Sequence, residues 1–236
     1  IQNRMIGSEG GIYTNVRPDT RWEGTLSESV GLLMNYCILR DNKKLFDREM
    51  KYLNKKLITE DHYIKWRDSK EKATCNAVID DLRIVRALLD AYDKWGDKKY
   101  FDLAGFIQDG IYQKQVEADS IDEFYDWKTK RSKKSIPLCY LDLYTMDRLS
   151  EFNRGWLRVS DRGAGLIANG RFGEKSPFYY KHYDYKSKKY APDEEYGKSK
   201  GICLTYTLYT ALHLAEMNKD TAEFAHWLSK EMDKGK

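Results

Sequence analysis

Apolar residues recur at helical spacing along most of the chain, and the helices they predict are of two kinds. Between Leu26 and Leu39 one helical face carries the apolar residues Val30, Leu33, Met34, Cys37 and Ile38. Leu32 and Leu39 fall on the opposite face, and a helix that is apolar all round is expected to be buried on both sides. The next segment, about 44–57, places its apolar residues among many Lys, Asp and Glu, which is typical of an exposed amphipathic helix.

This alternation of an inner and an outer helix repeats along the chain. Residues 77–92 are mostly apolar, and after Trp95-Gly96 residues 99–114 are again amphipathic. Further helices are predicted near 140–149, 156–167, 201–215 and 221–232. We therefore predict an all-α fold, a single α/α-toroid domain over residues 1–236. About eight helices are fewer than the twelve of a full (α/α)6 ring, which leaves an incomplete toroid as one alternative.

Short segments between the helices have strand character. Residues 176–190 alternate aromatic and polar side chains around a polar turn, which predicts a β-hairpin. Residues 63–67 and 10–15 are predicted to be extended.

The composition narrows the possible functions. Among 236 residues, 41 Lys and Arg against 37 Asp and Glu give a formal net charge of +4, which does not favour a nucleic-acid partner. No apolar run approaches the roughly 18 residues of a membrane span. The four cysteines form no CxxC pair and are expected to be small buried hydrophobes. The four histidines form no HExxH motif, and P-loop, GxGxxG and GxSxG motifs are absent, so neither a metal nor an organic cofactor is expected.

Glu28 is the one charged residue between Leu26 and Leu39, and it lies in the first turn of that helix. A carboxylate in a helix buried on both sides loses solvation, which raises its pKa and makes it a proton donor near neutral pH. The alternative is structural, because Thr25 to Glu28 also fits a capping box.

Asp80 and Asp81 open the next inner helix, after the possible N-cap Asn76. The helix dipole favours acidic residues there, which is the structural interpretation. The functional interpretation is that adjacent carboxylates at the mouth of an inner helix bind sugar hydroxyls. Arg83 is expected to form an ion pair with one of them.

Aromatic residues near the supposed cleft form a third group. Flat rings stack on sugar faces, and Tyr adds a polar tip. Most of these rings are expected to pack in the core, whereas some bind substrate. The group comprises Trp22, Trp66, Tyr140, Tyr144, Phe178, Tyr179, Tyr180 and Tyr183.

Two motifs resemble those of glycoside hydrolase family 8. Residues 27–34 read SESVGLLM, similar to the family's S-E-G-x-G-Y-G-M, in which the Glu is the general acid. Residues 77–95 resemble the signature A-[ST]-D-[AG]-D-x-x-[IM]-A-x-[SA]-L-L-x-A-x-x-x-W at full spacing. Asp81 matches the second acid of this signature, Ile79 replaces the first, and Asp80 is one step away from the missing carboxylate.

The resemblance implies an (α/α)6 barrel that cleaves β-1,4-linked glycans with inversion, with Glu28 as the general acid. It also implies a later aspartate as the general base, and inversion requires that carboxylate at about 6.5–9.5 Å from the acid. The candidates are Asp142 and Asp184, followed by Glu194 and Glu195. Asp80, Asp81, Trp66, Tyr140 and Tyr183 are expected to hold the sugar chain.

The predicted function is therefore an inverting, endo-acting glycoside hydrolase that needs no metal or cofactor. We expect a monomeric bacterial protein at the cell surface or outside the cell, with its leader absent from this chain. The expected partner is a polysaccharide, and a self-made exopolysaccharide is one candidate. The replacement of the first signature acid by Ile79 leaves a second hypothesis, a glycan-binding protein on a degenerate hydrolase scaffold. A polysaccharide lyase on the same kind of toroid is a third.

Overall fold

The computed structural model describes residues 5–14, 24–173, 176–192 and 202–235. The chain forms two compact units, and each is described by itself. The first comprises residues up to Gln115 together with Phe124–Ser132, and the second comprises Val116–Glu123 and the residues from Lys133 onward. The single-domain prediction stays a prediction. Among the described residues, no helix is both long enough and apolar enough to cross a membrane.

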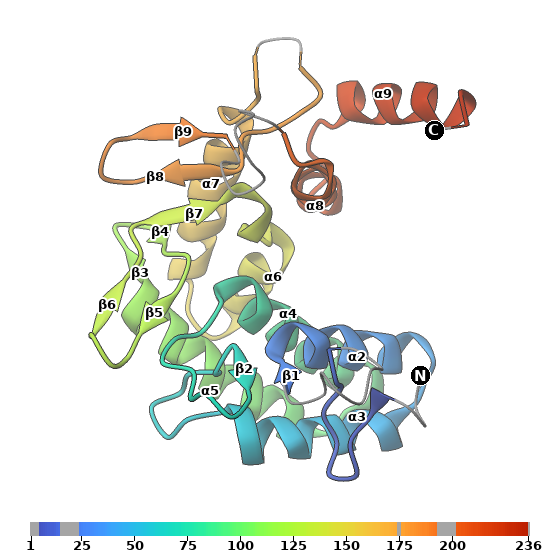
Figure 1. Cartoon of the computed structure of the whole chain (residues 1–236), viewed down its shortest axis with the longest axis vertical. Helices are drawn as coiled ribbons and strands as arrows, with labels where there is room; N and C mark the ends of the chain where they lie inside the picture. The colour runs from blue at the N-terminus through green and yellow to red at the C-terminus, as the bar shows by residue number, and fades with distance from the viewer. Residues whose placement is uncertain (1–4, 15–23, 174–175, 193–201, 236) are drawn as a thin grey trace. The chain divides into compact units, whose positions relative to one another are not determined.

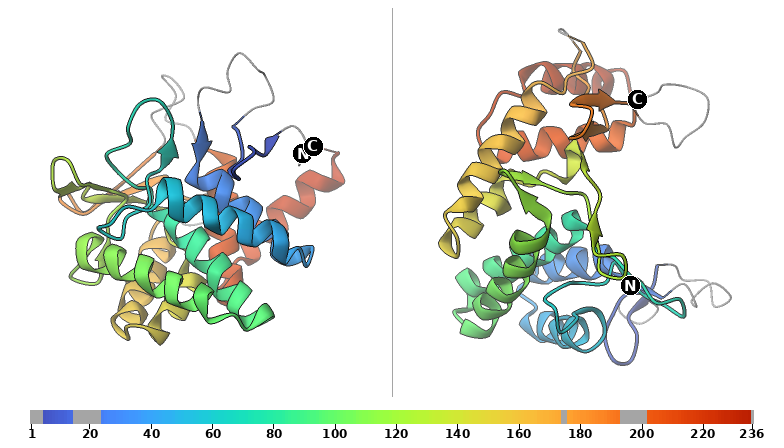
Figure 2. Two further views of the ribbon diagram at one scale, coloured as in Figure 1. Left: turned by 90° about the horizontal axis from the view of Figure 1, so that it is seen from below. Right: turned by 90° about the vertical axis from the view of Figure 1, so that its left-hand side faces the viewer.

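The first unit is a stack of helices (Figure 1). Its main helices are α2 (Ser27–Leu39), α3 (Lys43–Tyr52), α4 (Val78–Trp95) and α5 (Lys98–Gln115), and a π-helical turn, Leu53–Leu57, continues α3. The helix α4 packs against α2 on one side and α5 on the other, as Figure 2 also shows. Short antiparallel pairs join β1 (Thr25–Leu26) to β2 (Arg67–Asp68) and β5 (Tyr125–Asp126) to β6 (Arg131–Ser132).

Local sequence signals explain where these helices begin and end. The Asn42 side chain accepts a hydrogen bond from the backbone N–H of Leu45 at 3.1 Å and so caps α3. Gly96 ends α4 in the left-handed conformation, with φ of 69°, and its N–H donates to the Tyr92 carbonyl. The helices predicted at 77–92 and 99–114 are present as α4 and α5, on either side of this glycine.

The prediction that α2 is buried on both sides is wrong. The side that carries Val30, Met34 and Cys37 is fully buried against α3 and α4. On the other side Leu32 is 47% and Leu39 is 83% exposed. The reason is that helical spacing fixes which side chains share a face, whereas no described element of the first unit covers this second face.

The second unit combines helices with a small sheet (Figure 1). Strands β7 (Ser135–Pro137), β8 (His182–Asp184) and β9 (Lys189–Ala191) form an antiparallel sheet in that order. The predicted hairpin within 176–190 is thus present as β8 and β9. The other elements are β3 (Val116–Glu117), β4 (Ser120–Ile121), the 3-10 turns Leu138–Tyr140 and Leu149–Glu151, α6 (Leu143–Arg148), α7 (Gly155–Ala168), α8 (Leu204–Glu216) and α9 (Ala222–Asp233).

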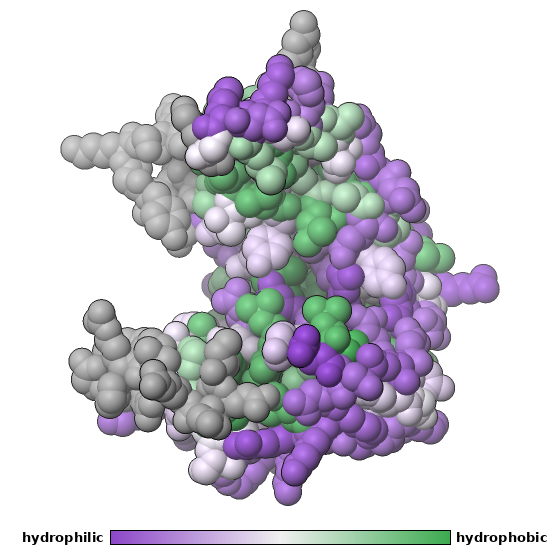
Figure 3. All heavy atoms as spheres, turned by 90° about the vertical axis from the view of Figure 1, so that its right-hand side faces the viewer, coloured by the Kyte–Doolittle hydropathy of each residue, from purple (hydrophilic) through white to green (hydrophobic). Residues whose placement is uncertain are grey.

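Both units also have hydrophobic residues at their surfaces (Figure 3). In the first unit these include Leu32, Tyr36 and Leu39 of α2. In the second they include Leu204, Leu208, Tyr209 and Leu212 of α8. Helices α2 and α8 thus each bury one face and leave the other exposed among the described residues, whereas α4 is buried over most of its length.

Candidate active site

Glu28 lies in the first turn of α2, on the exposed face of that helix. The expectation that burial would desolvate this carboxylate is wrong, because Glu28 shares its stripe with the exposed Leu32 and Tyr36. The capping-box alternative is also wrong. Thr25 lies in β1, the N-cap of α2 is Leu26, and this cap makes no side-chain hydrogen bond. Glu28 is therefore an accessible carboxylate at the start of a helix.

The residue before it, Ser27, ties three parts of the first unit together. Its backbone N–H donates to the Trp66 carbonyl at 3.0 Å, and its hydroxyl lies 3.1 Å from the same oxygen. The hydroxyl also donates to Oδ2 of Asp80 at 3.0 Å. Ser27 is fully buried, so these contacts fix the start of α2 against the start of α4.

Asp80 is the carboxylate that the fold places beside the Glu28 end of α2. Arg83, one turn later on α4, donates to Oδ1 of Asp80 at 2.7 Å, so the predicted ion pair is present. Burial raises the pKa of Asp80 to about 6, against the opposing effect of the Arg83 charge. The nearby Glu28 charge raises this pKa further, and the Ser27 hydrogen bond lowers it.

Gly31 allows α2 and α4 to approach closely at this point. A Cβ at Gly31 would lie 3.2 Å from both the Arg83 Cγ and the Ile84 Cγ1 atoms. Those distances are tighter than ordinary van der Waals contact, so a side chain here would press on Arg83. The glycine shared with the family-8 motif therefore has a packing role, which is to keep the two acidic helix starts together.

Asp81 faces a different environment from Asp80. It is almost completely buried, and the Asn76 amide donates to its Oδ2 at 2.6 Å. Burial raises the pKa of Asp81 well above its usual value. Asn76 does not cap α4, because the N-cap is Ala77. The Asn76 side chain also donates to Gln115 and accepts from the Tyr125 N–H. This network encloses Asp81, whose predicted role in sugar binding stays a prediction, whereas Asp80 pairs with Arg83 and Ser27.

Trp66 lines a pocket of about 590 Å³ next to the start of α2. The pocket is also lined by Thr14, Leu26, Arg67, Ser69, Lys70 and Glu71. The guanidinium of Arg67 lies 4.5 Å from the centre of the Trp66 ring, in cation–π geometry. The Trp66 side chain is partly exposed, and its predicted role in binding a sugar ring stays a prediction.

The remaining predicted site residues belong to the second unit. Asp142 is buried and caps α6, accepting from the Thr145 N–H and hydroxyl at 3.0 and 2.6 Å. Asp184 accepts hydrogen bonds from the N–H and the hydroxyl of Ser187, and these hydrogen bonds lower the pKa of Asp184. Tyr140 is half-buried in a 3-10 turn, whereas Tyr183 is buried against the ring of Tyr190.

Trp22, Glu194 and Glu195 lie outside the described residues. Ser27 was not predicted to be a site residue, although it precedes Glu28 in the first motif. Its contact with Asp80 joins residues 53 positions apart, which no local pattern reveals.

Comparison with known proteins gives related sequences and folds. No family model matches the chain. YdaJ of Bacillus subtilis (strain 168), a candidate lipoprotein by name, is 26% identical over 238 residues. This similarity covers 99% of the chain but only 61% of YdaJ. The chain therefore spans less than two thirds of this relative.

Solved structures resemble nearly the whole chain. A protein described as a novel alpha-amylase from Clostridium perfringens has a TM-score of 0.88 and 28% identity, over 99% of this chain and 69% of that one. PssZ from Listeria monocytogenes has a TM-score of 0.78 and 25% identity, over 100% of this chain and 70% of PssZ. Endoglucanase Cel10, a family 8 glycosyl hydrolase from Klebsiella pneumoniae, has a TM-score of 0.75 and 17% identity, over 96% of this chain and 74% of Cel10.

These similarities confirm the predicted fold class. The family-8 enzymes among the similar structures are α/α toroids, and they match the chain over most of its length. The resemblance carried by the motifs at 27–34 and 77–95 is thereby confirmed at the level of structure. The chain has the fold of the family 8 glycoside hydrolases.

Proposed function

We propose that this protein is a glycoside hydrolase whose general acid is Glu28. The single observation that carries the proposal is the joined start of α2 and α4. There an accessible carboxylate, Glu28, lies beside a second carboxylate, Asp80, that Ser27 and Arg83 hold in place. The family-8 fold and the two motifs support the same assignment.

Each group has a distinct part in this proposal. Glu28 is free to approach a glycosidic oxygen from the exposed face of α2 and to donate its proton to the leaving group. Asp80 cannot move in the same way, because two hydrogen bonds fix both of its oxygens. It is suited to accept hydrogen bonds from sugar hydroxyls, while Trp66 stacks on a neighbouring ring.

Inversion requires a second carboxylate that activates water on the opposite face of the sugar. Asp142 and Asp184 remain the proposed candidates for this general base. The anomeric form of the first product reports the stereochemistry, and proton NMR during the first minutes of turnover measures it directly.

The substrate class is a polysaccharide, and two linkages are in competition. The motifs and the endoglucanase structures favour a β-1,4-linked glycan cut within the chain. The alpha-amylase description of a structure with 28% identity favours an α-linked glucan. The lipoprotein name of YdaJ supports a cell-surface location.

Reducing-end release from a soluble cellulose derivative, a xylan and amylose tests the activity and the linkage together. Glu28→Gln preserves the size of the side chain and removes the proton, so turnover should fall at least about a hundredfold. Binding of the cleaved glycan, measured by affinity electrophoresis, should persist.

The matched control is Glu60→Gln, which changes an exposed glutamate in a turn of the same unit. This control should keep full activity. Full activity in Glu28→Gln would refute the assignment. Binding without release of any product from these glycans would instead support the glycan-binding hypothesis.

A further inference from the structure

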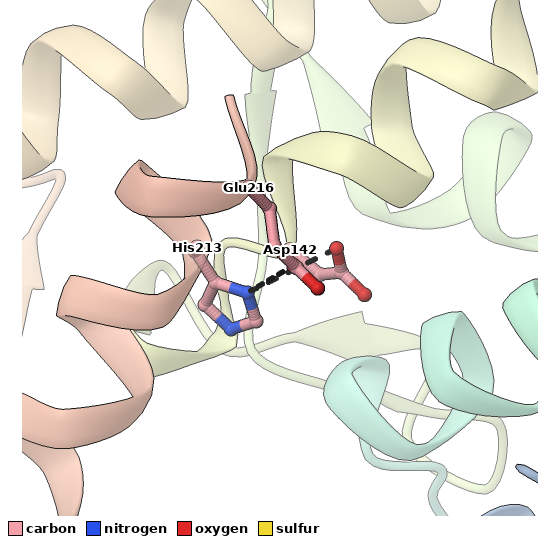
Figure 4. Close-up of side chains that lie close together, drawn as sticks. All are labelled: Asp142, His213 and Glu216. Atoms are coloured by element: carbon pink, nitrogen blue, oxygen red, sulfur yellow. Dashed lines mark ion pairs between the residues drawn. The ribbon is translucent and has the colours of Figure 1, made fainter. Parts of the chain in front are cut away.

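A buried histidine and two carboxylates meet within the second unit. His213 and Glu216 lie one turn apart on α8, and Asp142 lies at the start of α6 (Figure 4). One ligand atom from each side chain lies within 4.8 Å of the other two. The sequence has no metal motif here, because Asp142 is far from the other two residues along the chain.

The hydrogen bonds of His213 determine which ring nitrogen is available. Its Nε2 lies 3.0 Å from the Cys139 carbonyl oxygen, which can only accept, so Nε2 carries a hydrogen. Its Nδ1 is buried and makes no hydrogen bond within the described part of the chain. The whole side chain is only 6% exposed, so this nitrogen is a buried polar atom without a hydrogen-bond partner among the described residues.

The surroundings of Nδ1 are suited to a cation. Oδ1 of Asp142 and Oε2 of Glu216 each lie 3.9 Å from it. A neutral imidazole presents a lone pair to these two acceptors, and neither carboxylate offers it a hydrogen. A protonated ring would not hydrogen-bond either oxygen, because N–H···O distances are about 2.7–3.2 Å.

The spacing is close to that of a shared metal ion. Zinc bonds of about 2.0–2.1 Å to nitrogen and 2.0–2.2 Å to oxygen place tetrahedral ligand atoms about 3.3–3.5 Å apart, so each oxygen needs to move about 0.5 Å toward Nδ1 to share an ion with it. Glu216 is the most exposed of the three, at 21%, and can close on an ion that enters from solvent. An imidazole together with carboxylates favours a first-row transition ion over Mg²⁺ or Ca²⁺.

The neighbours of the cluster orient its ligands. The carbonyl of Cys139 fixes the ring of His213, which is the usual arrangement around a histidine that binds metal. Thr145 holds the Asp142 carboxylate through its N–H and its hydroxyl. Three protein ligands leave a fourth position for water or another ligand.

We propose that Asp142, His213 and Glu216 form a binding site for a divalent first-row transition ion such as Zn²⁺. The ion links the start of α6 to the end of α8 within the second unit. Binding of an ion there does not depend on the proposed hydrolase activity, although Asp142 is also a candidate general base. An ion bound there engages Asp142, which leaves Asp184 as the remaining general-base candidate among the described residues.

Isothermal titration of the EDTA-treated protein with ZnCl₂ tests the site. One equivalent should bind and raise the melting temperature, whereas MgCl₂ should do neither. Co²⁺ in place of Zn²⁺ should give visible d–d absorption bands. Glu216→Gln, at a partly exposed position, should weaken zinc binding at least tenfold, and His213→Gln should abolish it.

His226→Gln, which changes an exposed histidine on α9, is the control and should bind zinc like the parent protein. Circular dichroism of the metal-free variants shows whether each still folds. Because His213 is buried, Glu216→Gln decides the test if His213→Gln is unfolded. The proposal is wrong if the parent does not bind zinc, or if folded Glu216→Gln binds it as tightly as the parent.

Discussion

The clearest quantitative prediction concerns the pH dependence of stability caused by Asp80. Its pKa in the folded protein is about 6, against an ordinary value of 3.8, and burial is the main cause. The folded protein therefore binds this proton more tightly than the unfolded chain does. The stabilisation is fully present below about pH 3.8, falls as the pH rises, and is lost above about pH 6.

The magnitude follows from the two pKa values. At 1.36 kcal/mol for each pKa unit, the interval from 3.8 to about 6 corresponds to about 3 kcal/mol. About 2 kcal/mol of this loss falls between pH 4 and pH 7. Asp80→Asn removes the titrating group, so the parent should lose about 2 kcal/mol more than this variant over that interval.

Hydrogen exchange of the buried α4 amides measures the effect in the first unit alone, once intrinsic exchange rates are corrected for pH. Urea unfolding at the same pH values provides a second measurement. Asp61→Asn, which changes an exposed loop residue, should follow the parent profile. If the parent and Asp80→Asn have parallel profiles from pH 4 to pH 7, the assigned environment of Asp80 is wrong.

Three further substitutions test the packing and one buried hydrogen bond. In α5, Gly110→Ala places a Cβ 2.7 Å from the Cβ and the carbonyl oxygen of His62, so this change should destabilise the protein by about 2 kcal/mol. In α7, the Cβ of Gly165→Ala meets no atom within 4 Å, so this change should stabilise the protein by about 0.5–1 kcal/mol. Urea midpoints measure both changes, and equal effects would contradict the packing argument. Asn76→Leu removes the hydrogen-bond donor to buried Asp81 and should lower the free energy of unfolding by about 3 kcal/mol, measured by urea unfolding. An unchanged free energy of unfolding would mean that this hydrogen bond contributes nothing to stability.

Much of the fold could be predicted from the sequence because the signals are local. The alternation of apolar and amphipathic segments predicted α2 to α5, and Gly96 marks the end of α4 through its left-handed backbone. The motif around Glu28 identified the helix start at which the candidate site lies. Its glycine, Gly31, proved to be a point of close contact between helices.

The environments of the acidic residues could not be predicted in the same way. The sequence treats Asp80 and Asp81 as neighbours in one motif, yet one pairs with Arg83 and Ser27 and the other is enclosed with Asn76. Successive residues of a helix point about 100° apart, so adjacent side chains enter different surroundings.

The sequence by itself determined which residues share a helix and which share a face of it, because the periodicity of the α-helix is a local property. Only the tertiary structure decided which faces are covered and which distant side chains meet. The exposure of Glu28 depends on what packs against α2. The meeting of His213 with Asp142 depends on how α8 and α6 pack, and such contacts leave no repeating pattern along the chain.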